Sequence, residues 1–328
     1  MVINMKVLYA ILSALLSLIL SFTSSLGEGA DHMIKPTDAK NIRMCFATAS
    51  DTHITDSSVR YTQLKQGLAD MTYDTDIVDA VVFAGDLTDH GEKAQFDYLF
   101  EAFDEACKTE NIILATGNHD TWSDDGSVAG MKYFVDGYNA LTGRNIEKPY
   151  YTTVVNGYTF ITLASEGDHV YATISQEQID WFDAEMTKAS LSGLPIFVVC
   201  HFPINGTNGQ AELWDEGGIG EQSDAINAIL LKHSNVFYIS GHLHAGFTGG
   251  LIDAGPDYTI ESNGSVHYIN LPCFTYLNTE AGNPLSGCGY VFEVYDDYVL
   301  LRSRDYVMTG WLDLHDARID LVTAQAAS

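Results

Sequence analysis

Short apolar runs alternate with amphipathic stretches along most of the chain, from about residue 40 onward. The runs at 44–49, 78–84 and 112–115 have the length and composition of buried strands. Between the second and third runs, apolar side chains recur at helical spacing, at Phe96, Leu99, Phe100, Phe103 and Cys107. This strand–helix–strand order predicts parallel strands joined by right-handed crossovers.

The second half of the chain adds a hairpin and then further strands. Asn156-Gly157 between two apolar runs is a strong hairpin signal. Ser175, with Gln178 three residues later, is a capping-box pattern that predicts a helix through Met186. More strands are expected at 195–200, 236–239, 266–271, 290–294 and 298–302. We therefore predict one α/β domain with a layered sheet core and helices outside it.

The predicted domain spans residues 41–312, after a linker at 28–40 and before a C-terminal tail at 313–328. Within it, 121–149 and 203–222 are rich in turn-forming residues and are predicted to be irregular insertions. Long loops in a compact domain are often functional, so we expect these two to select the substrate. Their candidate wall residues, each with ordinary loop anchoring as the alternative, are Trp122, Tyr133, Asn205 and Trp214.

The first 27 residues are typical of a secretory signal peptide. Lys6 is followed by a nearly continuous apolar stretch over 7–20, and then by the small residues Ser24, Ser25 and Gly27. A membrane span needs about 20 apolar residues, so a retained anchor is the alternative that fits less well. We expect export to a secreted, periplasmic or cell-surface location, with no stable membrane span after cleavage.

The chain is strongly acidic, with a formal net charge of -28. Such a surface repels polyanions, and no cluster of Lys and Arg is present, so a nucleic-acid polymer is not expected as a partner. A small anion remains compatible with this charge, because salt screens electrostatic fields within about 8 Å.

Five cysteines are present, at Cys45, Cys107, Cys200, Cys273 and Cys288. The first three lie in apolar patterns and are predicted to be core residues. Cys273 and Cys288 could pair in an exported protein, but the odd count leaves that question open. No CxxC pattern occurs, which argues against a thiolate zinc site.

Five apolar strands end in residues that can bind metal ions. In open α/β sheets the ligand crevice lies outside the carboxyl ends of the strands, so these residues can converge although they are far apart in sequence. In extended backbone, residues two apart point to one face, which suggests that Asp51 and His53, and His242 and His244, act in pairs. The seven candidate ligands are Asp51, His53, Asp86, Asn118, His201, His242 and His244.

The candidate ligands are carboxylate, imidazole and amide groups, without a thiolate. This set suits manganese, iron or zinc better than copper or an iron–sulfur cluster. Seven ligands are too many for one tetrahedral ion, and they suit two divalent or trivalent ions about 3.5–4 Å apart that share a carboxylate.

The ordered pattern D-x-H, G-D, G-N-H-D, H and G-H-x-H resembles that of the calcineurin-like metallophosphoesterase superfamily. The resemblance implies a four-layer α/β/β/α sandwich of two packed mixed sheets flanked by helices, with a dinuclear metal site. It assigns Asp51, His53, Asp86 and His244 to one metal. It assigns Asp86, Asn118, His201 and His242 to the second, so that Asp86 bridges the two.

The resemblance also places His119 just outside the metals, as general acid or as a cationic stabiliser of the leaving oxygen. Asp120 either orients the His119 imidazole or caps the following turn.

Two details narrow the resemblance within the superfamily. Purple acid phosphatases have a tyrosine three residues after the Gly-Asp aspartate, where this chain has Asp89, and they lack the histidine that stands here as His53. The string Gly-Asp-Leu-Thr-Asp-His-Gly at 85–91 instead resembles class III cyclic nucleotide phosphodiesterases and related enzymes.

We therefore expect an exported enzyme that hydrolyses a small anionic phosphate ester, in particular a phosphodiester, by means of a hydroxide that bridges the two metals. The alternatives are a broad phosphomonoesterase and a non-catalytic surface binding protein on the same scaffold. A non-catalytic protein would be expected to have lost ligands, whereas every ligand position here is filled.

Overall fold

The computed structural model describes residues 34–74, 76–167, 172–245, 247, 258–275 and 286–322. The predicted signal peptide, its possible role as an anchor, and the first part of the predicted linker, 28–33, lie outside these residues. No helix in the described ranges is long and apolar enough to cross a bilayer.

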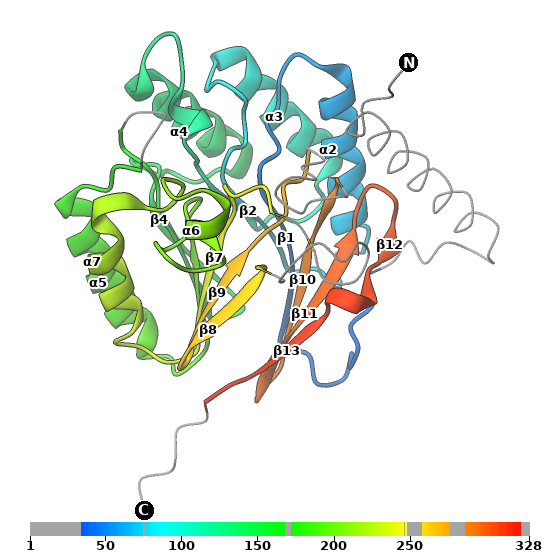
Figure 1. Cartoon of the computed structure of the whole chain (residues 1–328). Helices are drawn as coiled ribbons and strands as arrows, with labels where there is room; N and C mark the ends of the chain where they lie inside the picture. The colour runs from blue at the N-terminus through cyan, green and yellow to red at the C-terminus, as the bar shows by residue number, and fades with distance from the viewer. Residues whose placement is uncertain are drawn as a thin grey trace, which may run out of the picture.

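A seven-stranded mixed sheet forms one half of the core (Figure 1). Its order is β12-β11-β10-β1-β2-β3, and β13 also pairs with β11. The strands β1, β2 and β3 are parallel, as the sequence predicts, whereas β10 runs antiparallel to β1. Its strands are β1 (Met44–Ala49), β2 (Ala80–Ala84), β3 (Ile112–Ala115), β10 (Cys288–Val294), β11 (Tyr298–Asp305), β12 (Gly310–Trp311) and β13 (Ala317–Asp320).

A six-stranded mixed sheet forms the other half, in the order β4-β5-β6-β7-β9-β8. The four strands β5, β6, β7 and β9 are parallel, and antiparallel strands close both edges. The strands are β4 (Tyr151–Val155), β5 (Tyr158–Thr162), β6 (Ile196–Val199), β7 (Val236–Ser240), β8 (Ile260–Asn263) and β9 (Val266–Asn270).

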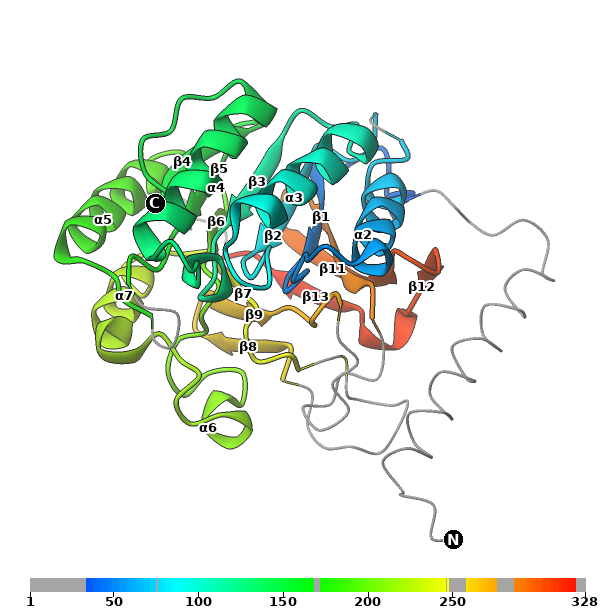
Figure 2. The ribbon, with the colours of Figure 1, turned by 90° about the horizontal axis from the view of Figure 1, so that it is seen from above.

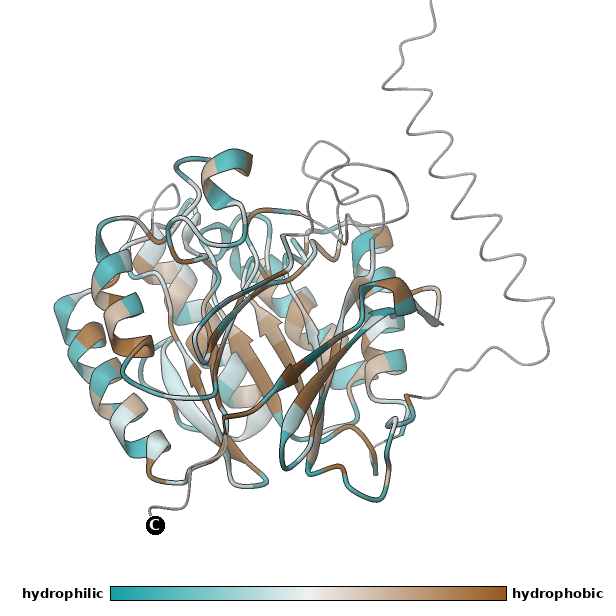
Figure 3. Cartoon of the chain, turned by 60° about the horizontal axis from the view of Figure 1, so that its bottom comes forward, coloured by the Kyte–Doolittle hydropathy of each residue, from teal (hydrophilic) through white to brown (hydrophobic). Residues whose placement is uncertain are grey.

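The two sheets pack face to face, and helices cover their outer faces, as Figure 2 shows from above. The inner core is rich in phenylalanine: the Phe46 ring lies 5.1 Å from that of Phe160 and 4.9 Å from that of Phe197. Figure 3 shows the same division by hydropathy, with apolar strands in the middle and polar positions on the helices. This arrangement confirms the predicted α/β/β/α sandwich.

Two separate sets of helices form the outer layers. On the seven-stranded sheet lie α2 (Ser58–Met71), α3 (Lys93–Ala106) and α4 (Ser127–Thr142). On the six-stranded sheet lie α5 (Gln176–Ser190) and α7 (Ser223–Leu230). The short helix α6 (Gln210–Leu213) and the single turns η1 (His119–Thr121), η2 (Gly220–Gln222) and η3 (Asp313–His315) lie in connections.

Local sequence signals determine the hairpin and the start of α5. Asn156 and Gly157 both have positive φ, 51° and 87°, as the tight turn between β4 and β5 requires. The Ser175 hydroxyl accepts a hydrogen bond from the Gln178 backbone N–H, as an N-cap should. The Gln178 side chain does not complete a capping box, because it bonds to the backbone of Ala164 instead.

The prediction that 121–149 is irregular is wrong over most of this range, because α4 occupies it. The buried face of α4 consists of Gly130, Phe134 and Tyr138 only, which is too narrow an apolar stripe to stand out in the sequence. The second insertion, 203–222, is irregular as predicted, apart from α6 and η2.

The fold also continues past residue 312, where the sequence analysis ends the domain. Strand β13 adds to the sheet by pairing with β11. At the other end, Ile34 is buried in the core, and the Thr37 backbone N–H donates to Glu293. The described part of the chain therefore belongs to one folded unit from residue 34 to residue 322.

Candidate metal centre

The predicted ligands follow strands whose carboxyl ends meet at one edge of the sandwich. Loops after β1, β2 and β3 approach it from one sheet, and loops after β6 and β7 approach it from the other. Six of the seven predicted ligands gather there in two clusters of metal-binding atoms. We call these the Asp51 group (Asp51, His53, Asp86 and His244) and the His201 group (Asp86, His201 and His242).

The Asp51 group joins the end of β1 to the end of β7. The Nε2 atoms of His53 and His244 are 3.1 Å apart, and His244 Nε2 is also 3.1 Å from Asp51 Oδ1. Asp86 Oδ2 lies 3.8 Å from His53 Nε2. These nitrogen and oxygen atoms converge on one point from separate loops, which is the arrangement that a cation requires.

The His201 group shares Asp86 with the Asp51 group. Asp86 Oδ2 is 3.2 Å from His201 Nε2, and that nitrogen is 3.1 Å from His242 Nδ1. The Nδ1 atom of His201 is 2.8 Å from the Ala84 carbonyl oxygen, which fixes the ring orientation and leaves Nε2 facing the group. Asp86 is therefore common to both groups, as a bridging carboxylate would be.

Asn118 completes the predicted set by its chemistry. Its side chain is 7% exposed, and its Oδ1 atom is buried without a hydrogen-bond partner among the described residues. A buried amide oxygen without a partner is costly, and coordination of a cation would remove that cost. The residues present thus fit a pair of metal ions, including at this position.

The backbone of the ligand loops is strained at five predicted ligands. Asp51, His53, Asp86, His242 and His244 all have φ between 43° and 71°, in the left-handed region. Non-glycine residues adopt it rarely, and such strain tends to be found at functional sites.

This geometry corrects the predicted pairing by extended backbone. His242 and His244 lie in a tight turn beyond β7, and they point into different groups.

Burial and mutual contact together set the charges of the two carboxylates. Burial alone would raise the pKa of Asp51, but the imidazoles of His244 and His201 lower it to about 2. Burial opposes ionisation of Asp86 too, yet His201, His119 and His53 hold its pKa well below the usual value. Both carboxylates are therefore ionised at neutral pH and available to a cation.

The pKa values of the two imidazoles in the His201 group are shifted in opposite directions. Burial would lower the pKa of His201, but Asp86 and Asp51 raise it to about 9. Burial lowers the pKa of His242 to about 3, and the neighbouring His201 adds to the effect. Without metal, one proton on His201 thus balances part of the carboxylate charge, and a metal ion would have to displace it.

His119 lies beside the groups, at the start of η1. Its Nε2 atom is 3.9 Å from Asp86 Oδ2, and its side chain is 27% exposed. Its Nδ1 atom is 2.7 Å from the carbonyl oxygen of Asp89, an acceptor, so Nδ1 carries a proton. The Nε2 atom therefore faces the site, and the protonated ring can donate from it.

The structure corrects the role predicted for Asp120. Its carboxylate accepts hydrogen bonds from the backbone of Leu87, Thr88 and Gly117 and from the Thr88 hydroxyl. It neither orients the His119 ring nor caps the turn that follows. Asp120 instead ties the loop after β2 to the loop after β3, and the Asp89 carbonyl orients the imidazole.

Asp89 contacts two of the predicted site residues, although the sequence did not predict it as a site residue itself. Its Oδ1 atom lies 3.5 Å from His53 Nδ1 and 3.1 Å from Arg60 Nη1. Arg60 also donates to the His53 carbonyl at 2.6 Å. Asp89 therefore contacts His53 with its carboxylate and His119 with its backbone. Its place three residues after Asp86 was the available signal.

Cys273 is a second residue whose surroundings the sequence did not predict. Cys273 and Cys288 do not form the disulfide that was left open, because both side chains are thiols. The segment after β9 runs beside the end of β1, and the Cys273 thiol donates to the Asp51 carbonyl at 3.4 Å. Its sulfur lies within 4.8 Å of ligand atoms of His53 and His244.

Two of the four predicted wall residues reach the site. The Trp214 ring lies over His242 with centroids 4.6 Å apart, and the Trp122 ring meets His119 at 5.5 Å. The others hold loops together: Tyr133 donates to Asp125, and the Asn205 side chain donates to the Gly220 carbonyl.

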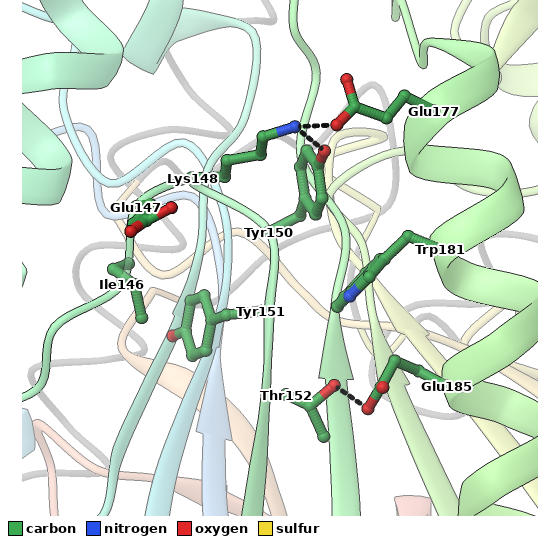
Figure 4. Close-up of a pocket in the computed structure, with 9 residues that line it drawn as sticks. All are labelled: Ile146, Glu147, Lys148, Tyr150, Tyr151, Thr152, Glu177, Trp181 and Glu185. Carbon is green, nitrogen blue, oxygen red and sulfur yellow. Dashed lines mark hydrogen bonds and ion pairs between the residues drawn. The ribbon is translucent and has the colours of Figure 1, made fainter.

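A cavity of about 460 Å³ lies elsewhere, between the start of β4 and α5 (Figure 4). Several of the polar side chains that line it form hydrogen bonds and an ion pair with one another. Lys148 pairs with Glu177 and donates to the Tyr150 hydroxyl, and the Thr152 hydroxyl donates to Glu185. None of the predicted ligands lines this cavity, so it is separate from the candidate metal centre.

Comparison with known proteins gives the same assignment as the geometry. Residues 44–246, more than half of the chain, match the family model described as calcineurin-like phosphoesterase. The chain belongs to the calcineurin-like phosphoesterase family. It is accordingly a metal-dependent phosphoric ester hydrolase, and the residues matched include all seven predicted ligands and His119.

One protein of similar sequence and one solved structure of similar fold agree with this family. The chain is 29% identical over 268 residues to a Rhodococcus erythropolis protein named "Probable cyclic nucleotide phosphodiesterase", covering 76% of this chain and 80% of that one. Its fold is similar to that of a dimetal phosphatase from Danio rerio, with a TM-score of 0.56 and 14% identity. That match covers 86% of this chain and all of the other.

Proposed function

We propose that this phosphoesterase is an exported enzyme with two metal ions that cleaves small phosphodiesters. The observation that carries the proposal is the position of Asp86 Oδ2, which both ligand groups share, with His119 Nε2 at 3.9 Å on the exposed side. A bridging carboxylate with an acid beside it is the constellation that metal-assisted ester hydrolysis uses.

The described side chains divide the work between holding and protonating. Asp51, His53, Asp86 and His244 would hold one ion, and Asp86, Asn118, His201 and His242 would hold the other. When bound, the ions would orient the phosphoryl group, offset its charge and lower the pKa of bound water. His119 would give its Nε2 proton to the departing oxygen, so that the alcohol leaves neutral.

The donor atoms restrict the identity of the ions. Oxygen and imidazole donors of this kind suit manganese, iron or zinc, and the strained loops fix the geometry in advance. Because the chain carries a net charge of -28, a phosphate anion would otherwise be repelled. The cations would reverse that field locally.

Two observations favour a diester over a monoester. The Rhodococcus erythropolis relative bears a name that specifies a phosphodiesterase. In addition, Arg60, a cationic side chain that donates to the His53 carbonyl, is paired with Asp89. A phosphodiester carries one negative charge, whereas a phosphomonoester carries close to two at neutral pH, so a site whose described cation is already paired suits the diester better.

The proposed chemistry is tested by loading purified protein with manganese, iron, zinc or no metal, and assaying bis(p-nitrophenyl) phosphate against p-nitrophenyl phosphate. Metal-dependent turnover with preference for the diester is expected. Preference for p-nitrophenyl phosphate would point to a phosphomonoesterase instead, and the absence of turnover on both would restore the binding-protein alternative.

Export is tested on the N-terminus of the protein recovered from producing cells. Because residues 1–27 have the composition of a cleaved signal, the mature chain is expected outside the cytoplasm and to begin near residue 28. Recovery of peptides that contain Lys6 from a membrane fraction would mean a retained anchor, and their recovery from the cytosol would contradict export.

A further inference from the structure

Three aromatic rings lie next to one another on the exposed side of the candidate metal centre. The Trp122 ring centroid is 4.7 Å from that of His90 and 5.5 Å from that of His119. Trp122 is 39% exposed, and the His90 side chain is 46% exposed. The exposed indole and the imidazole together present an aromatic surface, and neither residue is a predicted metal ligand.

The cluster is held rigidly by the loop contacts that Asp120 organises. Asp120 binds Thr88 by both backbone and hydroxyl, and that hydroxyl accepts from the Gly91 N–H. The His90 N–H donates to Gln95 on α3. A Cβ atom at Gly91 would meet the Asp120 carbonyl at 2.5 Å, so the loops that carry His90 and Trp122 are in direct contact. A surface that is ordered in advance binds with less entropy loss.

The position of His119 defines which part of a substrate would meet these rings. In the proposed reaction His119 donates its proton to the leaving oxygen, so the organic group on that oxygen must extend past the His119 ring. The Trp122 and His90 rings lie there. In a cyclic phosphodiester both ester oxygens belong to one organic group. That whole group would therefore extend past the His119 ring toward Trp122 and His90.

The charges around the rings restrict that organic group further. The Asp89 carboxylate lies 3.3 Å from His90 Nδ1. Close to Trp122 in the chain, the Asp124 N–H donates to the Glu92 carboxylate, and the Asp125 carboxylate accepts from Tyr133. A second phosphate on the leaving group would face these carboxylates, so an uncharged planar ring fits better than a charged one.

We propose that Trp122 and His90 form a leaving-group subsite that stacks on an uncharged planar ring, the ring of a nucleobase or an aryl alcohol, in a substrate with one phosphate. The subsite rests on the proposed function, because its direction is set by His119 as the acid. Stacking on exposed aromatic side chains is a general way to bind flat rings with little dependence on their substituents.

Calorimetric titration of the manganese-loaded protein with diphenyl phosphate and dicyclohexyl phosphate tests this subsite, with release of phenol or cyclohexanol followed in parallel so that the heat of binding is separated from turnover. The two ligands have similar size and the same charge, but only diphenyl phosphate carries planar rings. We expect Trp122→Leu to weaken the binding of diphenyl phosphate about five- to tenfold and that of dicyclohexyl phosphate less than twofold. Trp122→Phe should keep most of the affinity for both ligands. The matched control is Trp181→Phe in the separate 460 Å³ cavity, which should change neither constant.

Equal weakening of both ligands by Trp122→Leu, or none, would overturn the subsite. His90→Leu gives an independent check, with a smaller loss expected for diphenyl phosphate alone. Metal content measured on every variant separates lost stacking from lost ions: a variant that has lost metal is set aside, and the other variant then decides.

Two further assays tell whether the stacked ring is a nucleobase or an aryl group, and they test the subsite separately from the proposed function. A Trp122-dependent KM for adenosine 3′,5′-cyclic monophosphate, but not for ribose 3′,5′-cyclic phosphate, would identify a nucleobase. The effect on diphenyl phosphate alone would identify an aryl group. If the protein cleaves no phosphodiester yet binds diphenyl phosphate through Trp122, the proposed function fails and the subsite stands. If it cleaves bis(p-nitrophenyl) phosphate while Trp122→Leu affects both ligands alike, the reverse holds.

Discussion

Two regions of this molecule bury charged side chains, and they do so in opposite ways. Between α2 and β11, the buried Arg304 guanidinium donates two hydrogen bonds to Asp70, at 2.6 and 2.7 Å, and lies 4.6 Å from the Trp311 ring. At the metal centre, ring nitrogens face one another at 3.1 Å, and Asn118 Oδ1 has no partner among the described residues. In the first region a cation and a carboxylate neutralise each other, whereas the second gathers atoms that can bind a cation.

The difference shows how a structural ion pair is distinguished from a site. Both regions are buried, and both contain carboxylates. Only the metal centre combines left-handed backbone at Asp51, Asp86 and His244 with donor atoms that converge without bonding fully to one another. Buried polar groups without complementary partners persist when a ligand completes them.

The largest expected effect comes from removing the residue that the two groups share. Asp86→Ala should lower metal content from two ions per chain to below one, because each group loses a ligand, and should reduce turnover at least a thousandfold. Elemental analysis with assays on bis(p-nitrophenyl) phosphate measures both. Retention of two ions would mean that Asp86 does not bridge.

The corresponding change in the Asp70–Arg304 pair should lower stability instead. Asp70→Leu leaves Arg304 buried without its carboxylate and should lower the free energy of unfolding by about 3–5 kcal/mol. Denaturant unfolding measures it, with metal content of the folded protein expected to stay at the wild-type value. Adding Arg304→Met should recover much of the loss, and a double variant as unstable as the single one would contradict this view of the pair.

Removal of the acid should affect rate without affecting metals. His119→Ala should keep two ions and lower turnover about 10²–10³-fold for alkyl esters, because their alkoxide leaving groups need a proton. The loss should be smaller for p-nitrophenyl esters, whose leaving group departs readily. A uniform loss across leaving groups, measured by kcat, would reject the acid role.

The smallest effect concerns Asp305, which lies next to the Asp70–Arg304 pair. Burial raises its pKa from 3.8 to about 6, and its Oδ1 accepts from the backbone of Val307 and Met308. The folded state therefore favours the protonated form. The contribution of Asp305 to stability is therefore fully present below about pH 4 and is lost as the pH rises through about 6.

Asp305→Asn should remove this dependence, since the amide keeps an acceptor oxygen without the charge. The variant should be more stable than wild type at pH 8, by up to about 3 kcal/mol, and similar to it at pH 4. Chemical denaturation at the two pH values measures the difference. A gain of equal size at both would mean that ionisation is not its cause.

Much of the fold could be predicted because its signals are local. The apolar runs marked β1, β2, β3, β6 and β7, and Asn156-Gly157 marked the hairpin. The helix α4 was missed, since only Gly130, Phe134 and Tyr138 form its buried face. Strand β13 was missed as well, because four residues with alternating polarity become a strand only when β11 offers its edge.

The candidate ligands could likewise be chosen from their places after strands, but their surroundings could not. Asp120 stood next to His119 in sequence and was assigned to it, yet its carboxylate bonds to Thr88 on another loop. Cys273 was considered only as a disulfide partner, although it comes to lie beside Asp51.

The sequence by itself determined the positions of the central strands, the family and the residues able to bind metal. These features depend on residue types and on spacing along the chain. Only the tertiary structure decided which donor atoms share an ion, which carboxylate holds which loop, and that His90 and Trp122 adjoin His119. Those relations depend on distances between loops that are up to about 190 residues apart in the chain, such as those of His53 and His244, and no local pattern encodes the packing that sets them.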